Sequence, residues 1–181
     1  MRFRIRGVPV IINYYFIAVL TLMLVVFKNE NILMCFLFCI FHELGHLAAM
    51  TFFGEKARGI TLGYFGIRID CGARIMPKVS EIVIAAAGPI VNLILMLFCR
   101  LFMLDEAAQI NLTLALFNLL PVSMLDGGRI ISPFVTERTM KTIGITVGII
   151  LSFFGALVAI YTRSNFLILV VSLYVLIGAI K

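Results

Sequence analysis

The chain has 181 residues, of which 62% are hydrophobic and 13% charged, and its mean hydropathy is +1.14. An ordinary soluble domain carries roughly 25% charged residues, so a fold of this composition could not hide its apolar surface from water. The composition excludes a soluble enzyme and a disordered chain, and it indicates one integral membrane domain over residues 1–181. The net charge of +6 is explained by the charge bias that orients membrane proteins, and no nucleic-acid partner is expected.

Six apolar segments are long enough to cross a bilayer as helices, because a span needs roughly 17–25 residues. In chain order they are Val8–Phe27, Ile32–Phe53, Ile82–Cys99, Ala107–Leu125, Thr142–Thr162 and Ser164–Ile180. The first is interpreted as an uncleaved helix, since its apolar stretch exceeds that of a signal peptide and no small-residue cleavage pattern is present. The predicted fold class is therefore an all-α membrane protein with six transmembrane helices.

Most of the 15 Lys and Arg residues fall in segments that six helices would place on one side of the membrane. The positive-inside rule makes that side the cytoplasm. We therefore expect a multi-pass protein of the cell membrane with both termini cytoplasmic.

The longest of these segments, Gly54–Glu81, shows alternating apolar residues interrupted by glycines. The alternating residues are Ile60, Leu62 and Tyr64, then Ile67, Ile69 and Cys71. A period of two with glycine breaks predicts a small β-hairpin or sheet in this cytoplasmic loop after the second helix. Because a sheet edge exposed to lipid is unfavourable, we expect it at the membrane interface or against the helices.

The second apolar segment contains the pattern H-E-x-x-H, formed by His42, Glu43 and His46. Residues four apart share one face of a helix, so both imidazoles could bind one zinc ion with Glu43 beside it as a general base. Each ionisable residue within a span is unfavourable by roughly 2.5 kcal/mol or more, so this pattern is not expected to occur in a membrane helix by chance. The alternative is a polar patch that hydrogen-bonds to neighbouring helices.

Cys35 and Cys39 continue the same helical face. Cys35 and His46 are separated by about 16 Å at 1.5 Å per residue, so one ion cannot reach both. The cysteines are interpreted as packing residues, and the alternative is that Cys39 lines the site.

Catalytic zinc usually has three protein ligands, and the chain has no third histidine. Asp126 is the preferred third ligand, because Pro121 and the glycines after Asp126 predict irregular backbone at membrane depth, which is tolerated only inside a protein or beside water. A plain helix-ending aspartate is the alternative. The remaining carboxylates fall in loops or on the outer side: Glu30, Glu55, Asp70, Glu81, Asp105, Glu106 and Glu137.

Three motifs, in this order, resemble those of the site-2 proteases, which are intramembrane zinc metalloproteases. Phe41–His46 resembles the active-site motif of that family, Gly88–Asn92 its G-P-x-x-N signature, and Asn118–Gly127 its N-x-x-P-x-x-x-x-D-G motif. The resemblance covers the second to fourth helices, a catalytic core of about residues 32–128.

The resemblance implies cleavage of a membrane-embedded segment of a protein substrate, with one zinc ion per chain. It assigns His42, His46 and Asp126 as zinc ligands and Glu43 as the general base. Asn118 is similar to a family asparagine that holds the substrate backbone or the oxyanion. Asn92 is a weaker candidate for that role, and an interhelical hydrogen bond is an equal alternative.

The six-helix layout is most similar to the sporulation-type subgroup, whose substrate is a membrane-associated sigma factor precursor. No CBS or PDZ domain is expected in this chain, so regulation by either in cis is not expected. A regulatory membrane partner and self-association both stay open.

Two rival functions remain. A divalent-metal transporter or carrier would also place His and Asp within the membrane, but it would not need Glu43, and no inverted repeat is recognisable. A binding protein that has lost catalysis is disfavoured by the intact Glu43.

Overall fold

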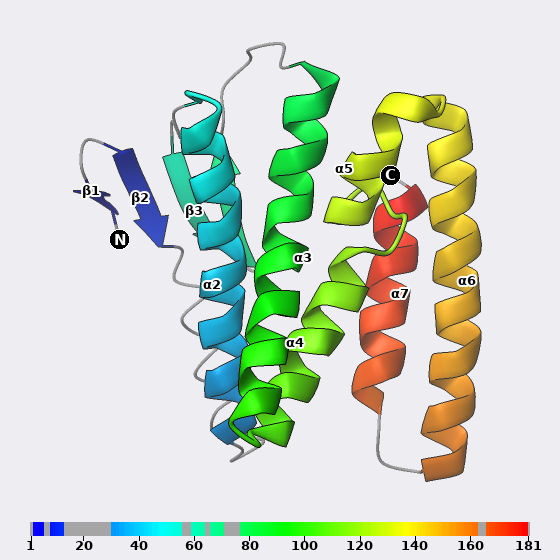
Figure 1. Ribbon diagram of the computed structural model, residues 1–181. Helices are drawn as coiled ribbons and strands as arrows, with labels where there is room; N and C mark the ends of the chain where they lie inside the picture. The colour runs from blue at the N-terminus through cyan, green and yellow to red at the C-terminus, as the bar shows by residue number, and fades with distance from the viewer. Residues whose placement is uncertain are drawn as a thin grey trace. The chain divides into compact units, whose positions relative to one another are not determined.

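The computed structural model describes residues 2–5, 8–12, 30–55, 59–63, 66–70, 77–162 and 166–180 (Figure 1). Two compact units make up the chain, Met1–Ala115 and Leu116–Lys181. The first contains a small sheet and the helices that carry the histidines. The second contains Asp126 and the last helices.

The first unit begins with a four-stranded sheet of order β1-β2-β3-β4. The strands are β1 Arg2–Ile5, β2 Val8–Ile12, β3 Gly59–Gly63 and β4 Gly66–Asp70. The pairs β1–β2 and β3–β4 are antiparallel, whereas β2 and β3 run parallel. In the β3–β4 pair Ile60 is opposite Ile69 and Leu62 is opposite Ile67, in the segment where the alternating pattern predicts a hairpin.

The first predicted span, Val8–Phe27, is wrong at its beginning. Val8–Ile12 is the strand β2, which pairs with both β1 and β3, so no helix begins at Val8. The physical reason is local, because Val8, Val10, Ile11 and Ile12 are β-branched and Arg2–Ile5 alternates charged with apolar residues. The remainder of that predicted span, residues 13–27, lies outside the described residues.

Helix α2, Glu30–Phe52, packs along α3, Lys78–Leu101 (Figure 1, cyan and green). Gly45 lies at the contact, where a β-carbon would be 2.8 Å from Cγ2 of Val91 and 2.9 Å from the Ala87 carbonyl oxygen. Because no side chain separates the helices there, their backbones approach closely. This close approach brings groups on α3 within hydrogen-bonding reach of the α2 histidines.

A tight turn reverses the chain between α3 and α4, Asp105–Asn118. Met103 adopts a left-handed φ of 57°, and the Leu104 N–H donates to the Cys99 carbonyl across the turn at 2.9 Å. As a result α4 returns along the bundle, and a buried cluster joins α2, α3 and α4. Its members are Phe38, Cys99, Ala107 and Ala108.

The second unit consists of the end of α4, the short helix α5 at Asp126–Ile131, a 3-10 turn at Ser132–Phe134, α6 at Glu137–Thr162 and α7 at Phe166–Ile180. The helices α6 and α7 pack side by side (Figure 1, orange and red). Gly148 allows this, because a β-carbon there would lie 2.8 Å from Cα of Leu176. A buried cluster of Val122, Val175 and Ala179 joins the segment before α5 to α7.

Within the described residues, three helices are long and apolar enough to span a bilayer: Asn31–Phe52, Lys78–Leu101 and Glu137–Tyr161. Leu169–Ile180 is a shorter apolar helix. The predicted span Ala107–Leu125 is interrupted near Pro121, as the sequence predicts, since α4 ends at Asn118 and Pro121 lies in the irregular segment that follows. Proline lacks an N–H and clashes with the preceding turn of a helix, which explains the break.

Candidate metal centre

Helix α2 places His42 and His46 one turn apart on its buried face. Their ring centroids are 4.8 Å apart with an interplanar angle of 82°, and the residues are 5% and 6% exposed. The i, i+4 spacing therefore gives the shared face that the sequence predicts.

The two Nε2 atoms converge on the backbone of α3 at Gly88. A β-carbon on residue 88 would lie 2.5 Å from Nε2 of His46 and 2.6 Å from Nε2 of His42. Both nitrogens therefore face one small space, which exists because residue 88 has no side chain.

The other ring nitrogens are held by groups on α3. Nδ1 of His46 lies 2.7 Å from the carbonyl oxygen of Ile84, and Nδ1 of His42 lies 2.5 Å from Oδ1 of Asn92. A carbonyl oxygen only accepts, so each Nδ1 donates its N–H. In the neutral rings, the lone pair that can bind a metal then lies on Nε2, as in many histidine metal sites.

Asn92 links three helices and is fully buried. Its Oδ1 contacts His42 on α2. Its Nδ2 donates to Oδ1 of Asn111 on α4 at 3.0 Å and faces the Phe38 carbonyl at 3.5 Å. Of the two roles that the sequence left open for Asn92, the structure contains the interhelical hydrogen bond.

Glu43 follows His42 directly on α2 and is half-buried. Cys35 and Cys39 lie on the preceding turns, and both are free thiols. The two cysteines, the two histidines and Glu43 thus all lie on one continuous helix.

Asp126 is the first residue of α5 and is 7% exposed. The two glycines after it fit the first turn of α5 tightly against residues 119–122. A β-carbon on Gly127 would lie 2.1 Å from the Leu119 carbonyl oxygen, and one on Gly128 would lie 2.1 Å from the Val122 carbonyl oxygen. The Asp-Gly-Gly sequence therefore lets irregular backbone fold closely around a buried carboxylate.

Two further groups accompany Asp126 in the second unit. Arg129, one turn later, has its guanidinium 3.5 Å from Oδ1 of Asp126. Asn118 is the last residue of α4 and is half-buried.

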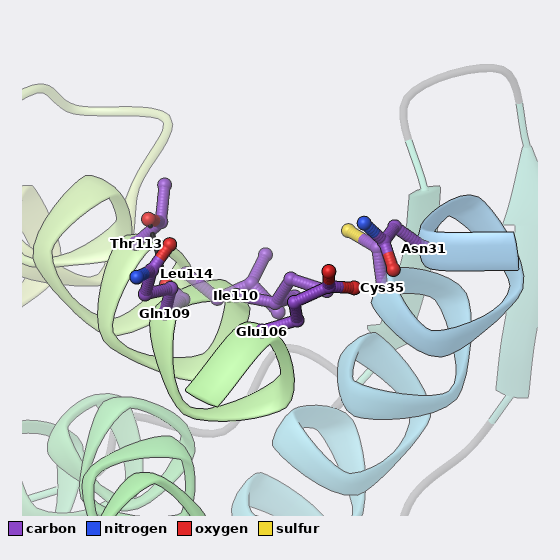
Figure 2. Close-up of a pocket in the computed structure, with 7 residues that line it drawn as sticks. All are labelled: Asn31, Cys35, Glu106, Gln109, Ile110, Thr113 and Leu114. Carbon is purple, nitrogen blue, oxygen red and sulfur yellow. Dashed lines mark hydrogen bonds between the residues drawn. The ribbon is translucent and has the colours of Figure 1, made fainter. Parts of the chain in front are cut away.

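A cavity of about 460 Å³ lies between the first turns of α2 and α4 (Figure 2). Asn31 and Cys35 line it from α2, and Glu106, Gln109, Ile110, Thr113 and Leu114 line it from α4. Its lining does not include His42, Glu43 or His46, so it is distinct from the histidine pair.

Sequence reasoning missed Asn111 and the steric role of Gly88. Asn111 gave no signal, because amide side chains such as those of Gln109 and Asn111 are ordinary in a helix. Gly88 was part of a motif, but only the folded helix pair shows that its missing side chain makes room for two imidazoles.

Comparison with known proteins points to one family. A family model described as peptidase family M50 matches residues 101–162. A zinc metalloprotease of Methanocaldococcus jannaschii is 28% identical over 207 residues, which cover 98% of this chain and 58% of that relative. The chain therefore spans less than two thirds of the length of this relative.

The fold is also similar to that of a solved protease structure. The solved structure of the site-2 protease from Methanocaldococcus jannaschii superposes with a TM-score of 0.69 at 27% identity, covering 99% of this chain and 93% of that chain. In sequence and in fold the chain is therefore similar to the site-2 proteases and to the M50 family of zinc metalloproteases.

Proposed function

We propose that this chain, as a member of the site-2 protease family, is an intramembrane zinc metalloprotease. It would hydrolyse a peptide bond in or near the transmembrane segment of a membrane-associated protein. The observation that carries the proposal is the convergence of two histidine Nε2 atoms at Gly88, with Glu43 beside them on the same helix. The similarities to zinc metalloproteases do not favour a divalent-metal transporter.

One zinc ion per chain would be held by His42, His46 and Asp126, all three of them buried. Two neutral imidazoles and one carboxylate are a donor set that zinc accepts in catalytic sites, where a fourth position stays open for water. The donors therefore fit zinc by their chemistry. Zinc held there would supply a Lewis acid that makes the attacking water easier to deprotonate.

Glu43 is the proposed general base. It takes a proton from the attacking water and passes it to the leaving nitrogen of the scissile bond. Asn118 has an amide that can donate to the oxyanion or hold the substrate backbone. Asn92 is engaged with His42 and Asn111, so we assign it to positioning His42 rather than to substrate.

The substrate segment must unwind to expose its scissile carbonyl, and β4 offers a place to hold it. Among the strands that the structure describes, β4 forms one edge of the sheet and pairs with β3 on its other side. An extended segment can add to such an edge through backbone hydrogen bonds. We propose that the opened substrate binds β4 in this way.

The finer parts of the proposal concern topology and substrate. Six spans with both termini and the sheet in the cytoplasm would place cleavage toward the cytoplasmic side. The sigma factor precursor of the sporulation-type subgroup is the substrate class to test first. A regulatory membrane partner would be tested by co-expression with the protease, and a homo-oligomer by size analysis of the purified protein.

The test pairs metal content with cleavage. Wild type and Glu43→Gln are purified in detergent, their zinc is counted, and each is incubated with sigma precursors and other single-span proteins. Glu106→Gln on α4, which removes an exposed carboxylate, is the matched control. We expect about one zinc in all three proteins and cleavage only by wild type and the control. Equal cleavage by Glu43→Gln would contradict the proposal.

A further inference from the structure

We infer that Asn111 is a positioning residue of the metal centre, which acts through Asn92 to determine which nitrogen of His42 carries the proton. The inference rests on the proposed function, because it matters only if Nε2 of His42 binds the metal. Asn111 lies outside the three motifs and is fully buried on α4.

Three hydrogen bonds in series connect α4 to His42. Asn111 Nδ2 donates to the Ala107 carbonyl at 2.9 Å, Asn92 Nδ2 donates to Asn111 Oδ1 at 3.0 Å, and His42 Nδ1 donates to Asn92 Oδ1 at 2.5 Å. Both amides are 0% exposed, so bulk water cannot replace either partner. A buried amide that loses its partner is unfavourable, and each amide therefore keeps the orientation its neighbour requires.

The shortest contact that sets the direction of the series is at the Ala107 end, and the Phe38 carbonyl, 3.5 Å from Asn92 Nδ2, favours the same orientation of Asn92. The Ala107 carbonyl can only accept, so the Asn111 amide must turn its nitrogen toward Ala107 and its oxygen toward Asn92. Asn92 then turns its nitrogen toward Asn111 and its oxygen toward His42.

A reversed Asn92 would present its amide nitrogen to Nδ1 of His42. The ring could then accept there only by moving its proton to Nε2, the nitrogen that faces Gly88. A protonated Nε2 cannot bind a metal. Asn111 thus keeps the proton of His42 on Nδ1, and it acts through Asn92 rather than by direct contact.

His46 has no such dependence, because a backbone carbonyl fixes its proton. The chain has only two histidines, so His46 provides an internal reference in any histidine-specific measurement. This difference separates a positioning role from a simple tether between α4 and α3, which would affect both histidines through the helix packing.

The first test reads the tautomers in metal-free protein by NMR with ¹⁵N-labelled histidine, at a pH where both rings are neutral. Wild type should show Nδ1–H for both histidines. In Asn111→Leu we expect His42 to gain an Nε2–H population while His46 is unchanged. Asn111→Ala is measured alongside, so that misfolding of one variant does not decide the outcome.

The second test measures zinc affinity by competition with a chelator. Asn111→Leu should bind zinc about tenfold more weakly, in the range typical of groups that support metal ligands. Asn111→Asp, which when protonated can donate to Ala107 and accept from Asn92, should restore most of the affinity. Thr113→Ala, an exposed position on the same helix, is the matched control and should bind zinc as wild type does.

The outcomes separate the inference from the proposed function. Unchanged tautomers and zinc affinity in Asn111→Leu and Asn111→Ala would overturn the inference, as would an Asn111→Asp affinity as low as that of Asn111→Leu. Wild type that binds no zinc would instead contradict the proposed function, since the tautomers are read without metal.

Discussion

Nδ1 of His46 lies 2.7 Å from the carbonyl oxygen of Ile84, a backbone group of the neighbouring helix. The Ile84 carbonyl only accepts, so this contact fixes the proton of His46 on Nδ1. His42 instead depends on the amide of Asn92. The metal-binding form of one histidine is therefore determined by backbone packing, and that of the other by a buried polar series.

Gly88→Ala should abolish zinc binding. The new methyl group would lie 2.5 and 2.6 Å from the two Nε2 atoms, far inside van der Waals contact, so it would occupy the space in which both nitrogens meet. We expect zinc content to fall to background by metal analysis of the purified protein.

Ile90→Ala, two residues along α3 at a position that is 50% exposed, is the control for changes in the helix. It should retain about one zinc per chain. Full zinc content in Gly88→Ala would mean that the histidines do not bind metal through Nε2 at this place.

Gly127→Ala should destabilise the second unit. Its β-carbon would lie 2.1 Å from the Leu119 carbonyl oxygen, a backbone atom that cannot rotate away. Overpacking of this kind costs about 1–3 kcal/mol, so the midpoint of thermal unfolding in detergent should fall. Ser132→Ala removes only an exposed side-chain hydrogen bond and should leave the midpoint nearly unchanged. Equal midpoints for the two variants would show that α5 is not tightly fitted.

The double variant Cys35→Ala, Cys39→Ala should keep its zinc. Both thiols lie on turns of α2 before His42, and the donor set proposed for the metal contains no sulfur. Zinc content and cleavage should remain close to those of wild type. A loss of zinc with unchanged helical content would assign one of these cysteines to the metal.

Proline substitutions in β4 should test the edge at which substrate is proposed to bind. Consecutive residues of a strand direct their N–H groups to opposite sides, so one of Arg68→Pro and Ile69→Pro removes a donor facing β3 and the other removes a donor at the outer edge. The outer-edge variant should lose cleavage while zinc content and thermal stability stay as in wild type. If neither proline reduces cleavage without unfolding the protein, substrate does not add to β4.

The histidine pair could be predicted because its geometry is local. Helical spacing alone puts His42 and His46 on one face, and the break at Pro121 was likewise visible in the sequence. The β3–β4 pairing also follows the alternation of Ile60, Leu62, Ile67 and Ile69 that the sequence displays.

The remaining features depend on packing between segments far apart in the chain. The series from Asn111 to His42 requires three helices to meet at fully buried amides, and no local pattern encodes such a meeting. The strand at Val8–Ile12 was mistaken for the beginning of a helix because continuous apolar residues fit either structure until a pairing partner, here β1 and β3, is known.

X-ray absorption spectroscopy of the zinc-loaded protein tests the central claim most directly, because it identifies the atoms around the metal. We predict two imidazole nitrogens at about 2.0–2.1 Å together with oxygen ligands, and no sulfur. In His46→Ala the imidazole contribution should halve or the zinc should be lost. Zinc without imidazole would contradict the assignment of His42 and His46 as the metal-binding pair, and a sulfur ligand at about 2.3 Å would contradict the proposed donor set of two histidines and one aspartate.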